Sequence, residues 1–197
     1  DSATHAESYN RDMRQAMENH RYGAQVTIKS PEELAEARLF RTASGSGFAV
    51  MPDGDVVAVF ASPNEPSRGS YAMLQAAVQA GGTKLDAFDT YLPDIYETVG
   101  FRPVARVPWN DAFAPETWNK ETFAAYNNGE PDIVLFVHDP DYFGGETNVP
   151  TVAEWADAAA LQDQALEELD KPTIAPQPKL KTKPEDSAAL AEDKSKA

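Results

Sequence analysis

One continuous stretch decides the order of the helices and strands: residues 56–106 read VVAVFASPNEPSRGSYAMLQAAVQAGGTKLDAFDTYLPDIYETVGFRPVAR. Apolar runs of strand length alternate here with segments whose apolar residues recur every three or four positions, as on one face of a helix. Glycines follow both helical segments, where a left-handed C-terminal cap needs them. The pattern predicts strands over 56–61, 84–88 and 104–107 and helices over 70–80 and 93–99.

The residues before this stretch predict a helix over 1–20, a short strand over 24–28 and a second helix that begins after Ser30. Ser30 is followed by a proline in the first turn and a glutamate three positions on, which together form a capping box. That helix is expected to fade near Thr42. A strand follows over 47–51, and the Asp-Gly pair after it predicts a hairpin with the first strand of the quoted stretch.

The residues after it begin with an aromatic-rich segment over 109–131, in which five aromatic residues fall within 18 positions. We interpret this segment as an ordered loop that its own rings anchor on the core, with Trp118 as the exposed contact. A lid or a partner-binding surface is the alternative. Residues 133–137 are an unbroken apolar run, which predicts a central strand. Residues 151–154 resemble a capping box that starts a helix running to Leu169.

Strands and helices alternate along the chain, so the sequence predicts a mixed α/β (α+β) fold with a mostly antiparallel sheet flanked by helices. We divide the chain into an N-terminal helix (1–22), a central domain (23–142), a C-terminal helical extension (143–170) and a tail (171–197). The tail holds four prolines and six lysines, a composition that predicts disorder or a linker. The start at Asp1 instead of Met suggests a piece of a longer polypeptide.

The charge of the chain excludes several functions. The 197 residues carry a formal net charge of −15, and all of this excess lies in residues 86–170, with 18 acidic and 3 basic side chains. Such a surface repels phosphate backbones, so we expect no nucleic-acid binding; an acidic mimic of nucleic acid is permitted, although the acidic residues show no regular spacing. No apolar run approaches the ~20 residues of a membrane span. Without cysteine, disulfides and thiolate sites are impossible, and no metal site is predicted.

The quoted stretch resembles the GCN5-related N-acetyltransferase superfamily. The resemblance rests on a strand (56–61), a loop containing Arg68-Gly69 that leads into a helix, and a later helix ending in Tyr96-x-x-x-Gly-Phe101; it covers roughly residues 24–138. It implies that the domain binds acetyl-CoA or another acyl-CoA and transfers the acyl group to an amine. It further implies that the strand holding Val59 parts in a V from the strand holding Leu85, leaving a slot for pantetheine.

The resemblance also assigns roles to individual residues. The implied cofactor-binding residues are Phe60, Ala61, Arg68, Gly69, Ser70 and Tyr71. The first two would hold pantetheine through backbone amides, and the other four would meet the pyrophosphate, which suits a helix N-terminus, a glycine and an arginine. Tyr96 would protonate the departing thiolate. Asp86 and Asp89 flank the end of the preceding strand. Asp89 is the candidate base; the alternative is that Asp89 or Thr90 caps the helix that follows.

Two departures from the superfamily pattern support a second hypothesis. The superfamily loop reads Gln/Arg-x-x-Gly-x-Gly/Ala, and aligning Gly69 with its first glycine places Pro66 at the Gln/Arg position and Tyr71 at the small-residue position. Proline has no N–H to donate, and tyrosine is bulky where the backbone should meet phosphate. The alternative is therefore a catalytically inactive binding or structural module on the same fold, which would dock a basic protein partner.

The segment that follows carries a narrower resemblance. Residues 101–119, FRPVARVPWNDAFAPETWN, and residues 131–140, PDIVLFVHDP, are similar to acetyltransferase-like domains of bacteriophages, which are embedded in large virion or polyvalent proteins. The resemblance implies a phage origin, a place in the virion or the host cytoplasm, and other virion proteins as partners.

Overall fold

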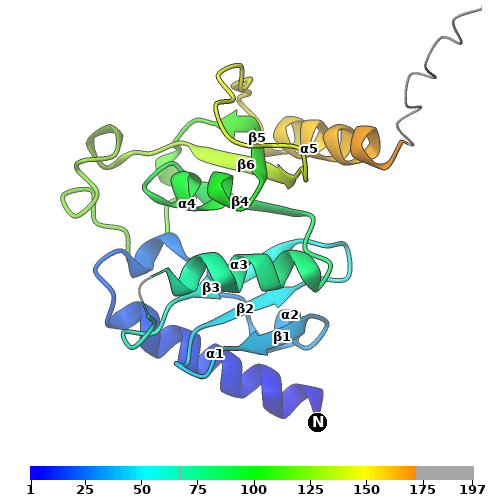
Figure 1. Cartoon of the computed structure of the whole chain (residues 1–197). Helices are drawn as coiled ribbons and strands as arrows, with labels where there is room; N and C mark the ends of the chain where they lie inside the picture. Colours follow the sequence, from blue (N-terminus) through cyan, green and yellow to red (C-terminus); the bar gives the residue numbers. More distant parts are fainter. Residues whose placement is uncertain (67, 172–197) are drawn as a thin grey trace, which may run out of the picture.

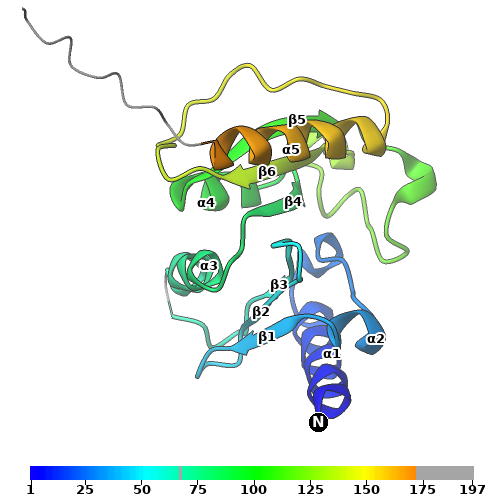
Figure 2. The same ribbon diagram turned by 90° about the vertical axis from the view of Figure 1, so that its right-hand side faces the viewer.

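Two small antiparallel sheets lie one above the other in the computed structural model, which describes residues 1–66 and 68–171 (Figures 1 and 2). The first sheet has the order β1-β2-β3, with β1 (Arg38–Arg41), β2 (Gly47–Val50) and β3 (Val56–Phe60). The second has the order β4-β6-β5, with β4 (Lys84–Phe88), β5 (Phe101–Val107) and β6 (Ile133–His138). The predicted mixed α+β fold is confirmed; the predicted disorder of the tail concerns residues that, from 172 on, lie outside the described part.

Five α-helices cover these sheets: α1 (Ser2–Glu18), α2 (Pro31–Leu34), α3 (Gly69–Gln79), α4 (Leu92–Thr98) and α5 (Trp155–Asp170). Helices α1 and α2 pack on one face of the first sheet, and α5 packs against β5 and β6 of the second. Helices α3 and α4 contribute to one core cluster that includes residues of both sheets. Its largest members are Phe48, Met73, Leu74, Tyr96, Phe101 and Phe136. A shared apolar core therefore joins the two halves of the molecule.

Most of the expected elements are present. The first helix, the hairpin, α3 and α4 form close to their predicted bounds, and β4 matches its prediction residue for residue. The apolar run in β6 does lie between two partners, β4 and β5. Strand β5 starts three residues earlier than predicted, at Phe101.

Three local predictions are wrong, each because a tertiary contact prevails. Residues 24–28 form no strand; a 3₁₀ turn occupies Gly23–Gln25, and Gln25 exchanges hydrogen bonds with the side chains of Tyr91 and Thr90. The helix after Ser30 has its capping box but ends at Leu34; after a short turn, the residues from Arg38 on pair with β2 as β1. Phe40 of β1 stacks on Phe48 of β2 with a centroid distance of 4.7 Å.

The third error concerns the start of α5. Thr151 does not cap this helix, because it bridges to Arg106 beside β5, and the helix begins at Trp155. The bridge sets the chain along the sheet edge before it turns into α5, where Gln162 donates to the carbonyls of Leu85 and Phe136.

The two sheets meet at one parallel bridge, between Asp55 at the start of β3 and Lys84 at the start of β4. The backbone N–H of Thr83 donates to the carbonyl of Gly54 beside it, at 2.8 Å. Beyond this bridge, no ladder pairing joins β3 to β4 in the described residues, and the two strands diverge (Figure 2). We call the space between them the strand gap.

The environment of Asp55 at this bridge predicts an unusual dependence of the free energy of unfolding on pH. Burial, together with the charges of Asp86 and Asp53, raises the pKa of Asp55 to about 7. A raised carboxyl pKa means that the folded state prefers the protonated form of Asp55. The contribution of Asp55 to the free energy of unfolding is therefore fully present below pH 4 and is lost as the pH rises through about 7. We expect the free energy of unfolding, measured with urea, to fall by on the order of 1–3 kcal/mol between pH 5 and pH 8, and Asp55→Asn to remove most of this fall.

Asp163→Asn, at an exposed position of α5, serves as the matched control and should follow the wild-type profile. An Asp55→Asn variant with the wild-type slope between pH 5 and pH 8 would contradict the assignment.

Candidate functional site

A β-bulge bends β3 next to the strand gap. Ala58 has φ = 53°, a left-handed conformation that costs free energy in any residue with a side chain, and the β2–β3 register shifts by one residue at this point. The Tyr9 hydroxyl on α1 donates to the carbonyl of Ala58 at 2.7 Å. Gly47 on β2 makes room for this contact, because a Cβ there would lie 2.9 Å from the rings of Tyr9 and Phe60. Helix α1 thus holds the bulge in place.

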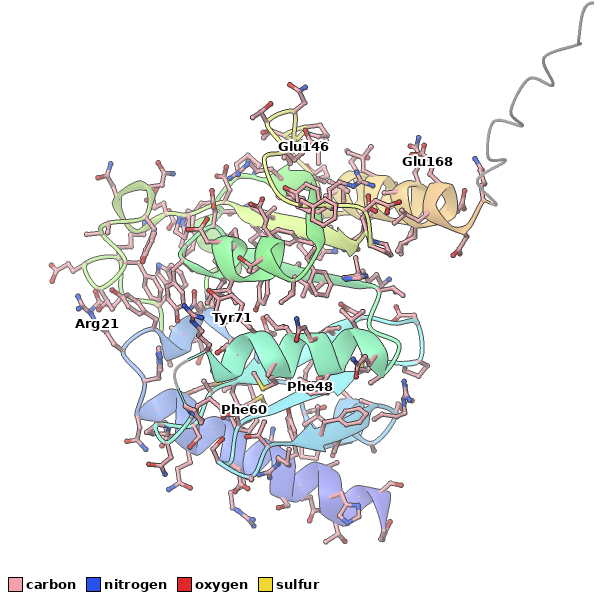
Figure 3. All side chains as sticks on the ribbon, in the orientation of Figure 1. Arg21, Phe48, Phe60, Tyr71, Glu146 and Glu168 are labelled. Atoms are coloured by element: carbon pink, nitrogen blue, oxygen red, sulfur yellow. The ribbon has the colours of Figure 1, made fainter. Side chains whose placement is uncertain are left out.

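The predicted pantetheine-binding residues lie at the end of the bulged strand. Phe60 is buried, and its ring packs edge-on against Tyr9 at 5.3 Å, on the α1 side of the sheet. Figure 3 shows Phe60 below α3, in the half of the molecule that contains α1. Its side chain therefore belongs to the core, and only its backbone and that of the half-buried Ala61 are available for a ligand.

The four predicted pyrophosphate-binding residues are contiguous at the start of α3. Arg68 is exposed, has φ = 68° and immediately precedes the helix, which begins at Gly69. Ser70 and Tyr71 are half-buried in the first turn, and Figure 3 places Tyr71 at this end of α3. Among the described residues, Arg68 makes no ion pair, so its guanidinium can meet an anion.

A carboxylate that the sequence analysis missed lies at the same place. Glu65 accepts hydrogen bonds from the hydroxyls of Ser44 and Ser46, and from that of Thr42 at 3.2 Å. These hydroxyls hold the pKa of Glu65 below its usual range. A Cβ on Gly69 would lie 2.1 Å from Glu65 Oε1, so the negative charge is in contact with the first residue of α3. The partners lie 19 to 23 residues before Glu65, which leaves no local sequence pattern to detect.

Tyr96, the predicted acid, is only 7% exposed on α4. Its ring packs edge-on against Phe101 and Phe136, with centroid distances of 6.3 and 5.9 Å. Burial, and after it the charges of Asp86 and Tyr91, raises the pKa of Tyr96. The phenol therefore keeps its proton at neutral pH, as a proton donor must.

Asp89, the predicted base, is engaged in an ion pair. Arg106 Nη1 contacts Asp89 Oδ2 at 2.5 Å and Asp132 Oδ2 at 3.3 Å. Asp89 does not cap α4, but the other candidate cap, Thr90, accepts a hydrogen bond through its hydroxyl from the N–H of Leu92, the first residue of α4, at 3.4 Å. The guanidinium neutralises the charge that a base would use.

Asp86, three residues earlier in β4, has a different environment. Its side chain is exposed, whereas its neighbours Leu85 and Ala87 are buried in the shared core. Burial by the surrounding protein raises the pKa of Asp86, and the charge of Lys29 partly opposes this.

The aromatic segment is the anchored loop that we expected, but its exposed residue is not the predicted one. Trp118 is half-buried, stacks on Phe123 with a centroid distance of 3.8 Å, and donates its indole N–H to the carbonyl of Gly129. Phe113 is the exposed aromatic, at 83%. Tyr22, just after α1, contacts Phe123 and so links this loop to the N-terminal part of the chain.

The described residues contain no group of three or more His, Cys, Asp or Glu side chains arranged to hold a metal ion. In the same residues, no helix is long and apolar enough to cross a membrane. A comparison with known proteins finds no family model, no curated protein and no solved structure that matches this chain.

The contact between Tyr9 and the bulge can be tested by removing one oxygen atom. Tyr9→Phe leaves the carbonyl of Ala58 without this donor, and we expect the free energy of unfolding to fall by about 1–2 kcal/mol in urea titrations. Tyr126→Phe is the matched control, because Tyr126 is half-buried and makes no side-chain hydrogen bond to the described residues; it should change stability by less than ~0.5 kcal/mol. Equal losses in the two variants would argue against a specific role for Tyr9.

Proposed function

We propose that this domain binds an acyl-CoA, with acetyl-CoA as the simplest case, and transfers the acyl group to an amine. The observation that supports this function is the strand gap: β3 and β4 are parallel at Asp55 and Lys84 and then diverge. Beyond the bridge, the described residues give this side of β3 no strand partner, so its backbone groups can pair with the amide groups of an extended pantetheine arm.

The residues around the gap fit such a ligand in part. The backbone at Phe60 and Ala61 would pair with pantetheine, and Arg68 with the amides of Gly69 and Ser70 would bind the pyrophosphate. The bulge at Ala58 supports the fit, because it bends and twists β3 beside the gap. Glu65 opposes it, because its carboxylate lies beside the first turn of α3.

The proposed chemistry requires little of the protein beyond positioning. When bound, acetyl-CoA supplies a thioester whose carbonyl carbon an amine can attack directly. The strand gap would hold that carbon against the amine, so that no covalent enzyme intermediate is needed. Tyr96 would give its proton to the sulfur as the C–S bond breaks, and its buried position keeps the phenol protonated until then.

One observation favours a second candidate function, a binding or structural module without turnover. The loop before α3 contains the Glu65 carboxylate, which accepts hydrogen bonds from Ser44 and Ser46. This negative charge, together with Pro66 and Tyr71, makes the loop poorly suited to bind a pyrophosphate. The acidic residues of 86–170 would then attract a basic protein partner. A phage origin, and virion proteins as partners, remain predictions that accompany either function.

Calorimetric titration with acetyl-CoA decides between the two candidates. If the acyltransferase proposal is right, the wild type binds acetyl-CoA, and Arg68→Ala weakens binding about five- to tenfold by removing the cation that meets the pyrophosphate. Arg11→Ala is the control, because the Arg11 side chain is 71% exposed on α1, away from α3. Absence of binding at millimolar acetyl-CoA, in wild type and Glu65→Gln alike, would leave only the binding module.

Tyr96→Phe tests the acid separately. We expect acetyl-CoA affinity to be unchanged and the release of free CoA, with butylamine as acceptor, to slow at least tenfold. The thiol can be measured with a thiol reagent without background, because the chain contains no cysteine. Unchanged turnover in this variant would exclude Tyr96 as the proton donor.

Glu65→Gln tests the opposing charge. The variant keeps the shape of the side chain and removes its charge, so we expect acetyl-CoA to bind about tenfold more tightly, equivalent to ~1.4 kcal/mol. Glu32→Gln, at an exposed position of α2, is the control and should leave affinity unchanged. A weaker affinity in Glu65→Gln would mean that this carboxylate orders the loop for its ligand instead of repelling it.

A further inference from the structure

We propose that copies of this chain assemble head to tail, with the exposed loop that follows β6 of one copy inserted into a groove beside α1 of the next. The inference does not depend on the proposed acyl transfer. The loop (139–150, yellow) lies at one end of the molecule and α1 (dark blue) lies at the other, in both views (Figures 1 and 2). A molecule therefore cannot place this loop in its own groove, whereas a second copy can.

The groove lies between α1, the turn after α2 and β1, and it has a volume of about 470 Å³. We call it the α1–β1 groove. Three apolar and three polar side chains make up most of its lining: Leu34, Ala37, Leu39, His5, Ser8 and Arg41. Strand β1 is the edge of its sheet, so within the described residues no further strand covers this side. A recess of this size, lined in part by apolar side chains, can take an aromatic ring.

The polar side of the α1–β1 groove carries positive charge. Arg41 Nη2 pairs with Asp12 Oδ2 at 2.5 Å, and Arg11 Nε pairs with the same carboxyl group at 3.3 Å. Two guanidinium groups thus share one carboxylate, which leaves an excess of positive charge beside the groove. Among the described residues that line the groove, none is acidic. A ligand that carries carboxylates is therefore attracted to this side.

The loop after β6 presents a ligand of this kind. Phe143 is 92% exposed, more than any other large apolar side chain of the described residues. Gly144 and Gly145 follow it with φ of 91° and 88°, and a Cβ on either of them would meet nothing within 4 Å, so the tip of the loop projects from the protein. Asp141 and Glu146 flank the ring, and residues 139–150 contain no lysine or arginine. The tip thus combines an aromatic ring with negative charge.

The base of the loop is held in place, so the tip is ordered before it binds. The N–H of Asp139 donates to the carbonyl of Gly100 at 2.9 Å, and the Asp139 carboxylate pairs with Arg102 on β5 at 3.1 Å. The Tyr142 hydroxyl accepts from the N–H of Glu146 at 3.2 Å, which closes the loop across Phe143. An ordered loop loses little conformational entropy on binding, and this favours its insertion into a preformed groove.

Two other ways of filling the groove fit less well. Phe113 is also exposed, at 83%, but the neighbouring Asp111 already pairs with Lys120 at 2.7 Å, so this segment offers the groove both charges. Antiparallel pairing of β1 with β1 of a second copy, in full register, would place Arg38 opposite Arg41 of that copy. Like charges at directly opposite positions destabilise a strand pair. The loop that carries Phe143 is therefore the occupant that the charges favour.

The proposed contact joins two different surfaces, so each copy still has a free loop at one end and a free groove at the other. Such a contact continues from copy to copy and forms open chains, instead of stopping at a two-fold dimer. The average mass of the particles should therefore rise steadily with protein concentration and pass that of a dimer.

Sedimentation velocity of the full chain, at concentrations up to millimolar, tests this assembly. We expect Phe143→Ser to weaken association at least tenfold, because it removes the ring that fills the groove. Phe113→Ser is the matched control, since it removes the other highly exposed phenylalanine, and association should stay within twofold of wild type. A wild type that remains monomeric at millimolar concentration, or equal association of wild type and Phe143→Ser, would overturn the proposal.

Mixing two defective variants tests the contact itself. Ser8→Glu adds bulk and a negative charge to the groove and should also prevent assembly; Ala35→Glu, at an exposed lining position, serves the same purpose if Ser8→Glu does not fold. Phe143→Ser keeps its groove and the groove variant keeps its loop, so the mixture should form a one-to-one complex and nothing larger. Absence of this complex, or assembly of the folded groove variant alone as in wild type, would show that the loop and the groove do not meet.

Discussion

The arrangement of the molecule depends on a single backbone junction. Asp55 and Lys84 bridge in parallel at the starts of β3 and β4, and the carbonyl of Gly54 accepts from Thr83 beside them. Because the two sheets share only this pairing within residues 1–66 and 68–171, their relative position is otherwise fixed there by side-chain packing in the core that α3 and α4 complete. A continuous sheet would have buried the edges of both strands. The single bridge leaves them available, and the candidate site follows from that.

Electrostatics divide the candidate site into two unlike ends. At the start of α3, Glu65 keeps its charge because three hydroxyls donate to it. Along β4, Asp86 has no such donors among the described residues, and burial favours its protonated form. The protein therefore holds the Glu65 carboxylate as an anion, whereas burial favours the uncharged form of Asp86. The charge on Glu65 thus opposes an anionic ligand at the start of α3.

The sequence predicted the elements whose signals are local. The bounds of β4 and the caps of α3 and α4 follow from apolar spacing and glycines within a few residues, and these predictions are confirmed. Strand β1 could not be predicted, because its four residues, RLFR, continue a helical spacing and become a strand only by pairing with β2. Glu65 and the pairing of Asp89 with Arg106 were also out of reach, since their partners are distant in the chain.

The hydroxyl of Tyr9 connects the N-terminal helix α1 to strand β3, two elements that are far apart in the sequence. Helix α1 was expected to be a separate N-terminal element, but it bonds to a carbonyl 49 residues further on, in the bend of β3. A segment that does not line the strand gap therefore helps to set its width. An insertion, a deletion or a bound partner at α1 would therefore alter the conformation of β3 at Ala58. Ligand binding in the strand gap would then depend on a helix that does not itself contact the ligand.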